Sequence, residues 1–249
     1  MVSKSTVKYI QSLQQKKFRD ADNVFVAEGP KLVSELFASG TFRLKAAYGT
    51  ATWMEEIYGD RETSEIDPVF EVSEDELERM SGFKTANKCL AVFEKRISGV
   101  PVPTDELMLM LDDIQDPGNL GTIIRTADWF GVSQIVCSKA TADCYNPKVV
   151  QSTMASLAHV ELLYTDLESW LDQHEEKQLL CATLHGEPLS TVEKAHNQVL
   201  VIGNESKGIN KELQGRASHL ISIPKFGRAE SLNAAVATGI ILSHFSGMR

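Results

Sequence analysis

Three polar, glycine-containing stretches have residue types that suit the binding of a ligand by backbone and amide groups. They are Asp116-Pro117-Gly118-Asn119-Leu120-Gly121, Gly203-Asn204-Glu205-Ser206-Lys207-Gly208, and the segment from Ile223-Pro224 to Ser231-Leu232-Asn233. Glycines permit tight turns and close approach of the backbone to a ligand, and the N-terminus of a helix favours an anion. Arg125 lies one turn into the helix expected after the first stretch, from which it can project toward the same site.

Each stretch also has a plain structural interpretation. The first is compatible with an ordinary strand-to-helix turn, Glu205 with a helix cap, and Ser231 with the N-cap of the last helix. Neither the dinucleotide-binding pattern GxGxxG nor a Walker-type GK-Ser/Thr sequence occurs in the first stretch, so both of those phosphate sites are excluded there.

The elements that must position these stretches form a regular series of short apolar runs with helical patterns between them. Such a series predicts an α/β domain with a parallel sheet covered on both faces. Ligands bind such sheets at the carboxyl ends of the strands, and all three stretches follow an expected strand. The expected strands are residues 107–111, 134–137, 160–163, 179–182, 199–202 and 220–223, and the best-defined helices are 122–130, closed by Gly131, and 234–245.

The first hundred residues have a different pattern and predict a smaller α/β domain. Val7, Ile10 and Leu13 recur at helical spacing, which predicts one helix over residues 4–17. A short strand at 24–26, a helix opening at Gly29-Pro30, a capping box at Ser73 and Glu76, and a strand at 88–93 follow. A turn-rich connector begins at Ser98. The predicted domains are therefore residues 1–97 and 107–249, joined by a linker at 98–106.

Composition is that of an ordinary globular protein, with 249 residues, 43% of them hydrophobic and 24% charged. No apolar run reaches the length of a membrane span, and the first residues do not resemble a signal peptide, so we expect a cytoplasmic protein without a membrane partner. Four separated cysteines without a Cys-x-x-Cys pair, and six histidines without ligand spacing, predict reduced thiols and no metal site.

Charge is distributed unevenly along the chain. The net charge of −9 argues against a nucleic-acid partner, yet residues 1–45 carry eight Lys or Arg and four Asp or Glu, a net charge of +4. Such a cluster can neutralise phosphates, although a solvated helix face is an equal alternative. The candidate phosphate contacts are Lys16, Lys17, Arg19 and Lys31.

Taken together and in this order, the three stretches resemble the SpoU (TrmH-type) family of RNA ribose 2′-O-methyltransferases. The matching motifs are Asn119–Ala127, Gly203–Gly208 and Ile223-Pro224 with Ser231-Leu232-Asn233, and the resemblance extends over residues 107–246. Lys17-Phe18-Arg19 and Phe25–Lys31 resemble the N-terminal SpoU substrate-binding domain, a ribosomal-protein-like RNA-binding module. The chain departs from the family pattern at Gln151, Ala155, Lys225 and Ala234-Ala235.

This resemblance implies a fold, a reaction and a set of site residues. The fold is a parallel sheet with a deep trefoil knot, and the reaction is transfer of a methyl group from S-adenosylmethionine to a ribose 2′-hydroxyl of RNA. It also implies a homodimer, and by fold analogy ribosomal RNA rather than transfer RNA. The implied catalytic residues are Asn119, Arg125, Glu205, Ser231 and Asn233, and the implied cofactor-binding residues are Thr183, Gly203, Ile223 and Leu232.

Two other functions remain open at this point. One is a non-catalytic RNA-binding or ribosome-assembly protein that retains the fold, and the other is methylation of a base or a protein. Arg125 has been regarded as the base in such enzymes, but a guanidinium is almost always protonated. We therefore expect Arg125 to grip the target phosphate or to stabilise a developing alkoxide.

Overall fold

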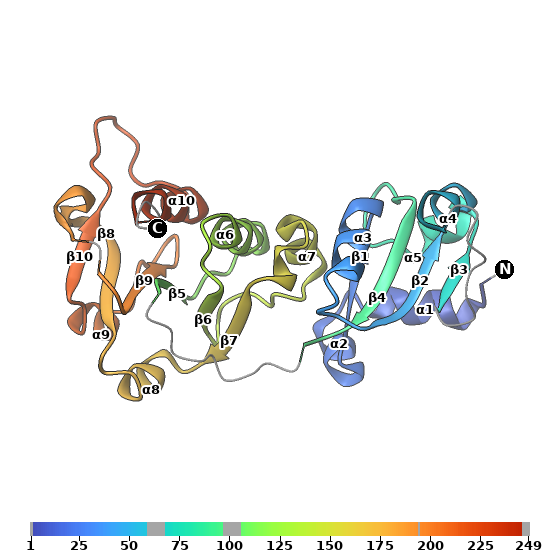
Figure 1. The fold of residues 1–249 in the computed structure, drawn as a ribbon, viewed down its shortest axis with the longest axis horizontal. Coiled ribbons are helices and arrows are strands. Elements are labelled where there is room, and N and C mark those ends of the chain that lie inside the picture. Colours follow the sequence, from blue (N-terminus) through green and yellow to red (C-terminus); the bar gives the residue numbers. More distant parts are fainter. Residues whose placement is uncertain (1, 59–67, 97–105, 194, 246–249) are drawn as a thin grey trace. The chain divides into compact units, whose positions relative to one another are not determined.

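A computed structural model describes residues 2–58, 68–96, 106–193 and 195–245. The chain divides into two compact units: Met1–Ile97 with Tyr145–Ala158, and Ser98–Cys144 with His159–Arg249. The elements of each unit are labelled in Figure 1. The linker predicted at residues 98–106 lies, except for its last residue, outside the described residues.

The first unit is built on a four-stranded sheet in the order β1-β4-β2-β3. β1 and β2 each pair with β4 in antiparallel fashion, and β3 is parallel to β2. All five residues of β1 are buried, so this strand lies inside the unit. The strands are β1 Val24–Glu28, β2 Leu44–Gly49, β3 Val69–Glu71 and β4 Cys89–Glu94, and the helices before residue 98 are α1 Lys4–Ser12, α2 Lys16–Asp22, α3 Pro30–Ala38, α4 Ala51–Tyr58 and α5 Glu74–Met80.

The single helix predicted over residues 4–17 is two helices, α1 and α2. The side chain of Arg19 explains the break, because its Nη1 donates to the carbonyl oxygens of Leu13 at 2.8 Å and Gln14 at 2.9 Å. These carbonyls follow the end of α1, where the backbone lacks intrahelical partners. Arg19 is only 1% exposed, so it satisfies this helix end from inside the unit.

A segment remote in sequence completes the first unit. The ring of Tyr145 lies 5.0 Å from that of Phe25, and its hydroxyl accepts from the backbone N–H of Arg96 at 3.2 Å. The guanidinium of Arg96 donates to the carbonyl of Ala158 at 2.9 Å. Helix α7 (Pro147–Thr153) packs against β1 between these two anchors. The division predicted from the sequence, at a single linker, instead included this segment in the domain of residues 107–249.

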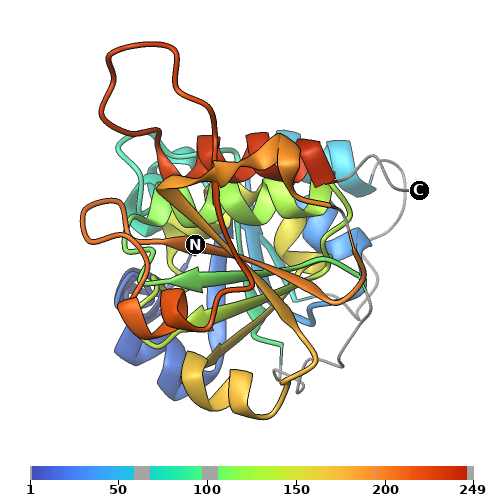
Figure 2. The same ribbon diagram turned by 90° about the vertical axis from the view of Figure 1, so that its left-hand side faces the viewer.

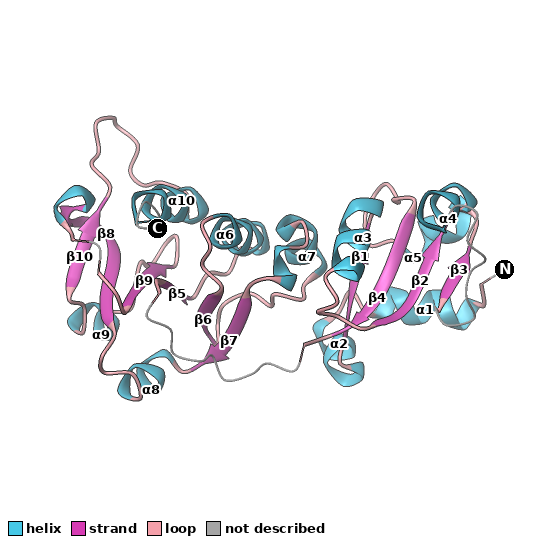
Figure 3. Ribbon diagram, in the orientation of Figure 1, coloured by secondary structure: helices cyan, strands magenta, loops and turns pink. Residues whose placement is uncertain are grey.

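The second unit contains a six-stranded sheet in the order β10-β8-β9-β5-β6-β7, with every neighbouring pair parallel. Figure 3 shows the strands and helices of this unit in separate colours. The predicted α/β class with a parallel sheet is confirmed. The strands are β5 Met108–Asp112, β6 Gln134–Ser138, β7 Glu161–Thr165, β8 Gln178–Pro188, β9 Gln198–Gly203 and β10 His219–Ser222, and the helices are α6 Pro117–Trp129, α8 Leu167–Asp172, α9 Lys211–Gly215 and α10 Ala234–Phe245.

Helices cover both faces of this sheet. Met108 and Met110 of β5 are fully buried in one cluster with Trp170 of α8 and Leu213 of α9. On the opposite face α6 and α10 lie side by side (Figure 2). Strands buried on both faces read as continuous apolar runs, which explains why the sequence pattern located them well.

The first glycine-containing stretch is the first turn of a helix, and the predicted helix start at residue 122 is wrong. Asp116 is the N-cap of α6, and its Oδ1 accepts from the backbone N–H of Asn119 at 2.8 Å. Pro117 occupies the first helical position, where a missing N–H costs nothing. Gly131, at φ +76°, follows the end of the helix in the left-handed conformation that the sequence indicated.

The second stretch is a loop tied to the end of β5. The backbone N–H of Asn210 donates to Asp112 Oδ2 at 2.7 Å, and Asn204 Nδ2 donates to the carbonyl of Asp113 at 2.8 Å. The loop folds back on itself beside Gly203, where a β-carbon would lie only 2.4 Å from the backbone nitrogen of Ile209. A side chain at position 203 therefore conflicts with backbone, which cannot move aside cheaply.

Gly203→Ala is expected to open this loop. Overpacking of a fixed backbone costs about 1–3 kcal/mol of unfolding free energy. Hydrogen exchange should show faster exchange of the amides of residues 204–210, and urea denaturation should show the loss of stability. Gly215→Ala is the matched control, because a β-carbon there meets no atom within 4 Å. Equal exchange and stability in both variants would contradict the close approach at Gly203.

Candidate functional site

The carboxyl ends of four neighbouring strands define the candidate site. β10, β8, β9 and β5 are adjacent in the sheet and parallel, so their carboxyl ends lie along one edge. The first stretch follows β5, the second follows β9 and the third follows β10. Parallel pairing thus brings together segments that are about a hundred residues apart in the sequence.

Two side-chain hydrogen bonds join the three stretches directly. The amide nitrogen of Asn119 donates to Glu205 Oε1 at 2.6 Å, and its amide oxygen accepts from Asn233 Nδ2 at 2.8 Å. Asn119 belongs to the first turn of α6 and Glu205 to the loop after β9. Asn233 is the residue immediately before α10. We call these three residues the polar cluster.

Local capping orients the amide of Asn233. Its Oδ1 accepts from the backbone N–H groups of Ala235 at 2.9 Å and Val236 at 3.3 Å, so Asn233 is the N-cap of α10. With the oxygen engaged by the helix, the amide nitrogen faces Asn119. The expectation that Ser231 caps this helix is wrong. Ser231 is exposed, and its hydroxyl forms no hydrogen bond with any described residue.

The polar cluster retains unused hydrogen-bonding capacity. Each amide nitrogen carries a second hydrogen, and the carboxylate of Glu205 has a second oxygen. Asn119 is half-buried, whereas Glu205 and Asn233 are exposed. The cluster can therefore donate to and accept from a ligand hydroxyl without losing its internal bonds.

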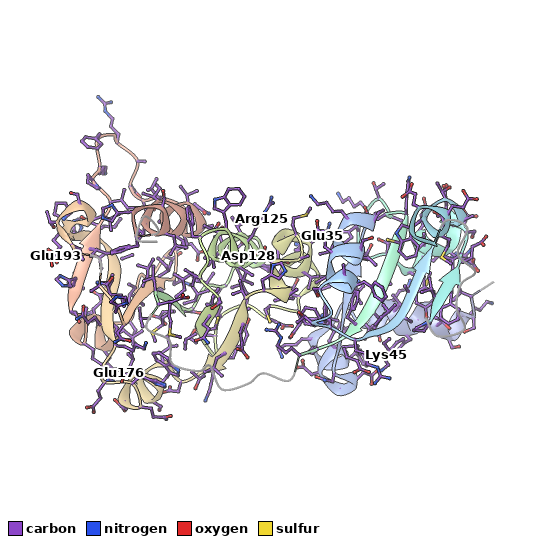
Figure 4. The ribbon with its side chains drawn as sticks, viewed as in Figure 1. Glu35, Lys45, Arg125, Asp128, Glu176 and Glu193 are labelled. Atoms are coloured by element: carbon purple, nitrogen blue, oxygen red, sulfur yellow. The ribbon has the colours of Figure 1, made fainter. Side chains whose placement is uncertain are left out.

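Arg125 lies outside the hydrogen-bonded cluster. It follows Asn119 by six residues on α6, which is about 9 Å along the helix axis. Its side chain is exposed and forms no hydrogen bond or ion pair within the described part of the chain. Figure 4 shows it projecting from α6. The cation is therefore available to an anionic ligand.

The predicted cofactor-binding residues lie at the same edge of the sheet. Gly203 and Ile223 are the last residue of β9 and the first residue after β10, and Leu232 precedes Asn233. Thr183 lies in an irregular part of β8. There the pairing with β10 shifts from Cys181–Leu220 to Glu187–Ile221, and the residues between Cys181 and Glu187 are out of register.

This irregular part also brings two backbones very close together. A β-carbon on Gly186 would lie 2.3 Å from the carbonyl oxygen of Leu220. The strand ends near Thr183, Gly203 and Ile223 are therefore packed backbone against backbone, and neither Gly186 nor Gly203 has room for a side chain.

Electrostatics hold the loop after β9 in place. Burial raises the pKa of Asp112, and the neighbouring Asp113 adds to this effect, while the N–H of Asn210 acts in the opposite direction. Lys207 Nζ lies 3.4 Å from Asp113 Oδ2 and offsets part of this negative charge. Sequence analysis overlooked both aspartates. Two consecutive acids at the end of an apolar strand were the available signal.

Three of the four predicted phosphate contacts in the first unit are exposed, and one is not. Lys16, Lys17 and Lys31 are exposed; Lys16 pairs with Asp20 at 2.6 Å, and Lys17 lies over the ring of Phe18 at 4.7 Å. Arg19 is buried with its guanidinium on carbonyl oxygens, so the expectation that it contacts phosphate is withdrawn.

Among the described residues, no group of three or more His, Cys, Asp or Glu side chains is placed to hold a metal ion. Within the described ranges, no helix combines the length and apolar character needed to cross a bilayer. All four cysteines are buried.

Comparisons with known proteins agree with this geometry. The model of the SpoU rRNA Methylase family matches residues 106–243, and that of the MRM3-like substrate binding domain matches residues 4–91. The chain is 31% identical over 244 residues to the 23S rRNA (guanosine(2553)-2′-O)-methyltransferase RlmP of Bacillus subtilis, covering 97% of this chain and 96% of that protein.

Solved structures show the same relationship. An AdoMet-bound rRNA methyltransferase from Sinorhizobium meliloti superposes with a TM-score of 0.86 at 32% identity, over 98% of this chain and 95% of that one. A TrmH-family protein from Porphyromonas gingivalis gives a TM-score of 0.86 at 33% identity, over 98% of each chain. With three loops meeting at one edge of a parallel sheet and relatives matched along nearly their whole length, this chain belongs to the SpoU rRNA methylase family.

Proposed function

We propose that this chain transfers a methyl group from S-adenosylmethionine to a ribose 2′-hydroxyl of RNA. The observation that carries the proposal is the polar cluster of Asn119, Glu205 and Asn233 at the carboxyl edge of four parallel strands. It occurs in a chain 31% identical to an enzyme named for 2′-O-methylation of ribosomal RNA.

The residues at this edge fit the methyl donor. At Gly203 and Gly186 a β-carbon would strike backbone of the same unit, so the strand ends at this edge are closely packed and held in place. We assign Gly203, Ile223 and Leu232 to the donor, with Thr183 as a further contact. S-Adenosylmethionine supplies a methyl group bound to a sulfonium sulfur. The thioether that remains after transfer is a good leaving group.

The protein must align the attacking oxygen with the methyl group and assist the loss of its proton. A new carbon–oxygen bond forms, the carbon–sulfur bond breaks with its electron pair going to sulfur, and the hydroxyl proton passes to solvent water. The amides of Asn119 and Asn233, together with Ser231, orient the hydroxyl. Glu205 is the anionic member of the cluster and favours departure of the proton.

Arg125 has an electrostatic role in this scheme. A guanidinium stays protonated in proteins, so it cannot act as the base at neutral pH. It binds the phosphate beside the target ribose or stabilises negative charge developing on the 2′-oxygen. Its exposure and lack of partners among the described residues support this role.

The knot and the homodimer belong to the same proposal. β10 pairs with β8 at the sheet edge, and the chain then crosses back so that α10 packs against α6 and β9. This course supports the deep trefoil knot of the family. Val236 and Ile240 are 52% and 41% exposed one helical turn apart on α10, and Trp129 of α6 is 84% exposed. This apolar surface supports a second copy of the chain as partner.

The RNA is proposed to be ribosomal and the enzyme cytoplasmic. The relative from B. subtilis is named for 23S ribosomal RNA, and residues 4–91 match a substrate-binding domain found beside such methylases. The exposed Lys16, Lys17 and Lys31 supply the positive charge that RNA phosphates require.

The function is tested by incubating the protein with methyl-labelled S-adenosylmethionine and unmodified transcripts of 23S rRNA, 16S rRNA and tRNA. Label on a ribose 2′-oxygen of a ribosomal transcript is the expected result, with the position mapped by resistance to alkaline cleavage. Binding of the donor without transfer to any RNA would favour the non-catalytic alternative. Label on a base or on protein would favour the other substrate class.

Arg125→Ala should lose methyl transfer while retaining the cofactor. Removal of a charge-stabilising donor typically lowers the rate about 10²–10³-fold. Single-turnover transfer and calorimetry with S-adenosylhomocysteine measure the two effects separately. Arg216→Ala, which removes an arginine paired with Asp172 in the same unit, is the control. Rates equal to those of the parent enzyme would rule out a catalytic role for Arg125.

Replacement of Lys16 and Lys17 by Ala should weaken RNA binding and its dependence on salt. The logarithm of the binding constant falls as log salt rises, and each lost phosphate contact makes this negative slope shallower by about 0.7–0.9. Filter binding of the labelled 23S transcript at several salt concentrations gives this slope. Lys88→Ala serves as control, because Lys88 pairs with Glu56 outside α2. An unchanged slope in the double variant would leave these lysines as a solvated helix face.

A further inference from the structure

The loop between β10 and α10 carries a fully exposed aromatic side chain. Phe226 is 98% exposed and is flanked by Lys225 and Arg228, which are also exposed. Figure 2 shows this loop projecting away from the sheet of its own unit. We call Lys225, Phe226, Gly227 and Arg228 the loop tip.

The loop tip has no support from the rest of the unit. Within the described part of the chain, Lys225, Phe226, Arg228 and the nearby Glu230 form no side-chain hydrogen bond, ion pair or ring contact. The loop after β9 is different, because Asn204 and Asn210 tie it to the end of β5. One loop of the site is therefore rigid, and the other presents an aromatic ring to solvent.

The loop tip is continuous with the catalytic machinery. Seven residues after Phe226 the same segment reaches Asn233, which donates to Asn119 in the polar cluster. A polymeric substrate at the polar cluster can therefore also reach the tip, because seven residues span at most about 25 Å. The tip also carries two cations and only the single acid Glu230 nearby, in a chain whose net charge is −9.

We propose that Phe226 stacks on a nucleobase of the RNA substrate while Lys225 and Arg228 bind the adjoining phosphates. This inference rests on the proposed function and adds a specificity-determining contact to it. An aromatic face stacks on any unpaired base, and neighbouring cations bind its backbone. The target ribose must leave a regular helix to present its 2′-oxygen, so an unpaired base is available there.

A second protein copy fits the loop tip less well. Interfaces between protein chains are depleted in Lys at their centre, and two exposed apolar side chains without charged neighbours in the sequence, Val236 and Ile240, lie on α10 instead. Methyl-donor binding by Phe226 is also disfavoured, because the ring makes no contact with the unit that holds the donor. Both alternatives are outcomes of the test below.

Phe226→Ala is expected to raise KM for the 23S transcript about tenfold, since base stacking on an aromatic side chain is worth roughly this much. The Kd for S-adenosylhomocysteine and the dimer measured by sedimentation should not change. Phe70→Ala is the control, because Phe70 is also an exposed phenylalanine but stacks on Tyr48 among acidic residues of the first unit. It should behave as the parent enzyme.

Phe226→Trp distinguishes stacking from a merely structural role. This variant should retain KM and show quenching of its added indole fluorescence by a single-stranded twelve-nucleotide RNA, beyond the quenching of the parent. Unchanged KM in Phe226→Ala with an active parent enzyme would overturn the inference alone. Altered donor affinity or a lost dimer would overturn it in favour of the alternatives. A parent that methylates no RNA would contradict the proposed function, and the fluorescence measurement would still test the stacking.

Discussion

The parallel pairing of β10, β8, β9 and β5 is the constraint on which the site depends. Parallel neighbours place their carboxyl ends on one edge, so every segment that leaves this edge starts within reach of the others. Asn119, Glu205 and Asn233 then need only local capping and turn geometry to meet. The two hydrogen bonds among them are a result of the sheet order and confirm that the edge is shared.

The loops at this edge differ in how they are held. The loop after β9 is fixed by Asp112, Asp113 and Asn204, and a backbone contact at Gly203 fixes its return. The loop after β10 is open until Asn233 begins α10. A fixed loop suits a small donor bound through backbone groups. An open, cationic loop suits a large polymer, because the loop can adjust to the shape of the polymer when it binds. Under the proposed function, recognition of the two substrates is divided between the loops after β9 and β10, the two strands that flank β8.

Much of this arrangement could be predicted from the sequence. The apolar runs of β5, β6, β8 and β9 are buried and shorter apolar runs mark the edge strands β7 and β10, so the pattern located all six strands. The family motifs named the three residues of the polar cluster. The first residues of the helices were harder to predict, because more than one nearby side chain can act as the N-cap. Asp116 starts α6 earlier than its glycines suggest, and Asn233 rather than Ser231 caps α10. Contacts that depend on tertiary packing were not predictable: Arg19 turns inward onto two carbonyls, and Tyr145 joins the first unit through Phe25 and Arg96.

We propose above all that the ends of β8, β9 and β10 form one binding site for the methyl donor. Hydrogen exchange of the full chain with increasing S-adenosylhomocysteine tests it most directly. Amides near Thr183, in residues 203–210 and in residues 223–233 should gain protection together, with the same half-saturating concentration. Protection confined to one of these segments, or found only elsewhere in the chain, would contradict it.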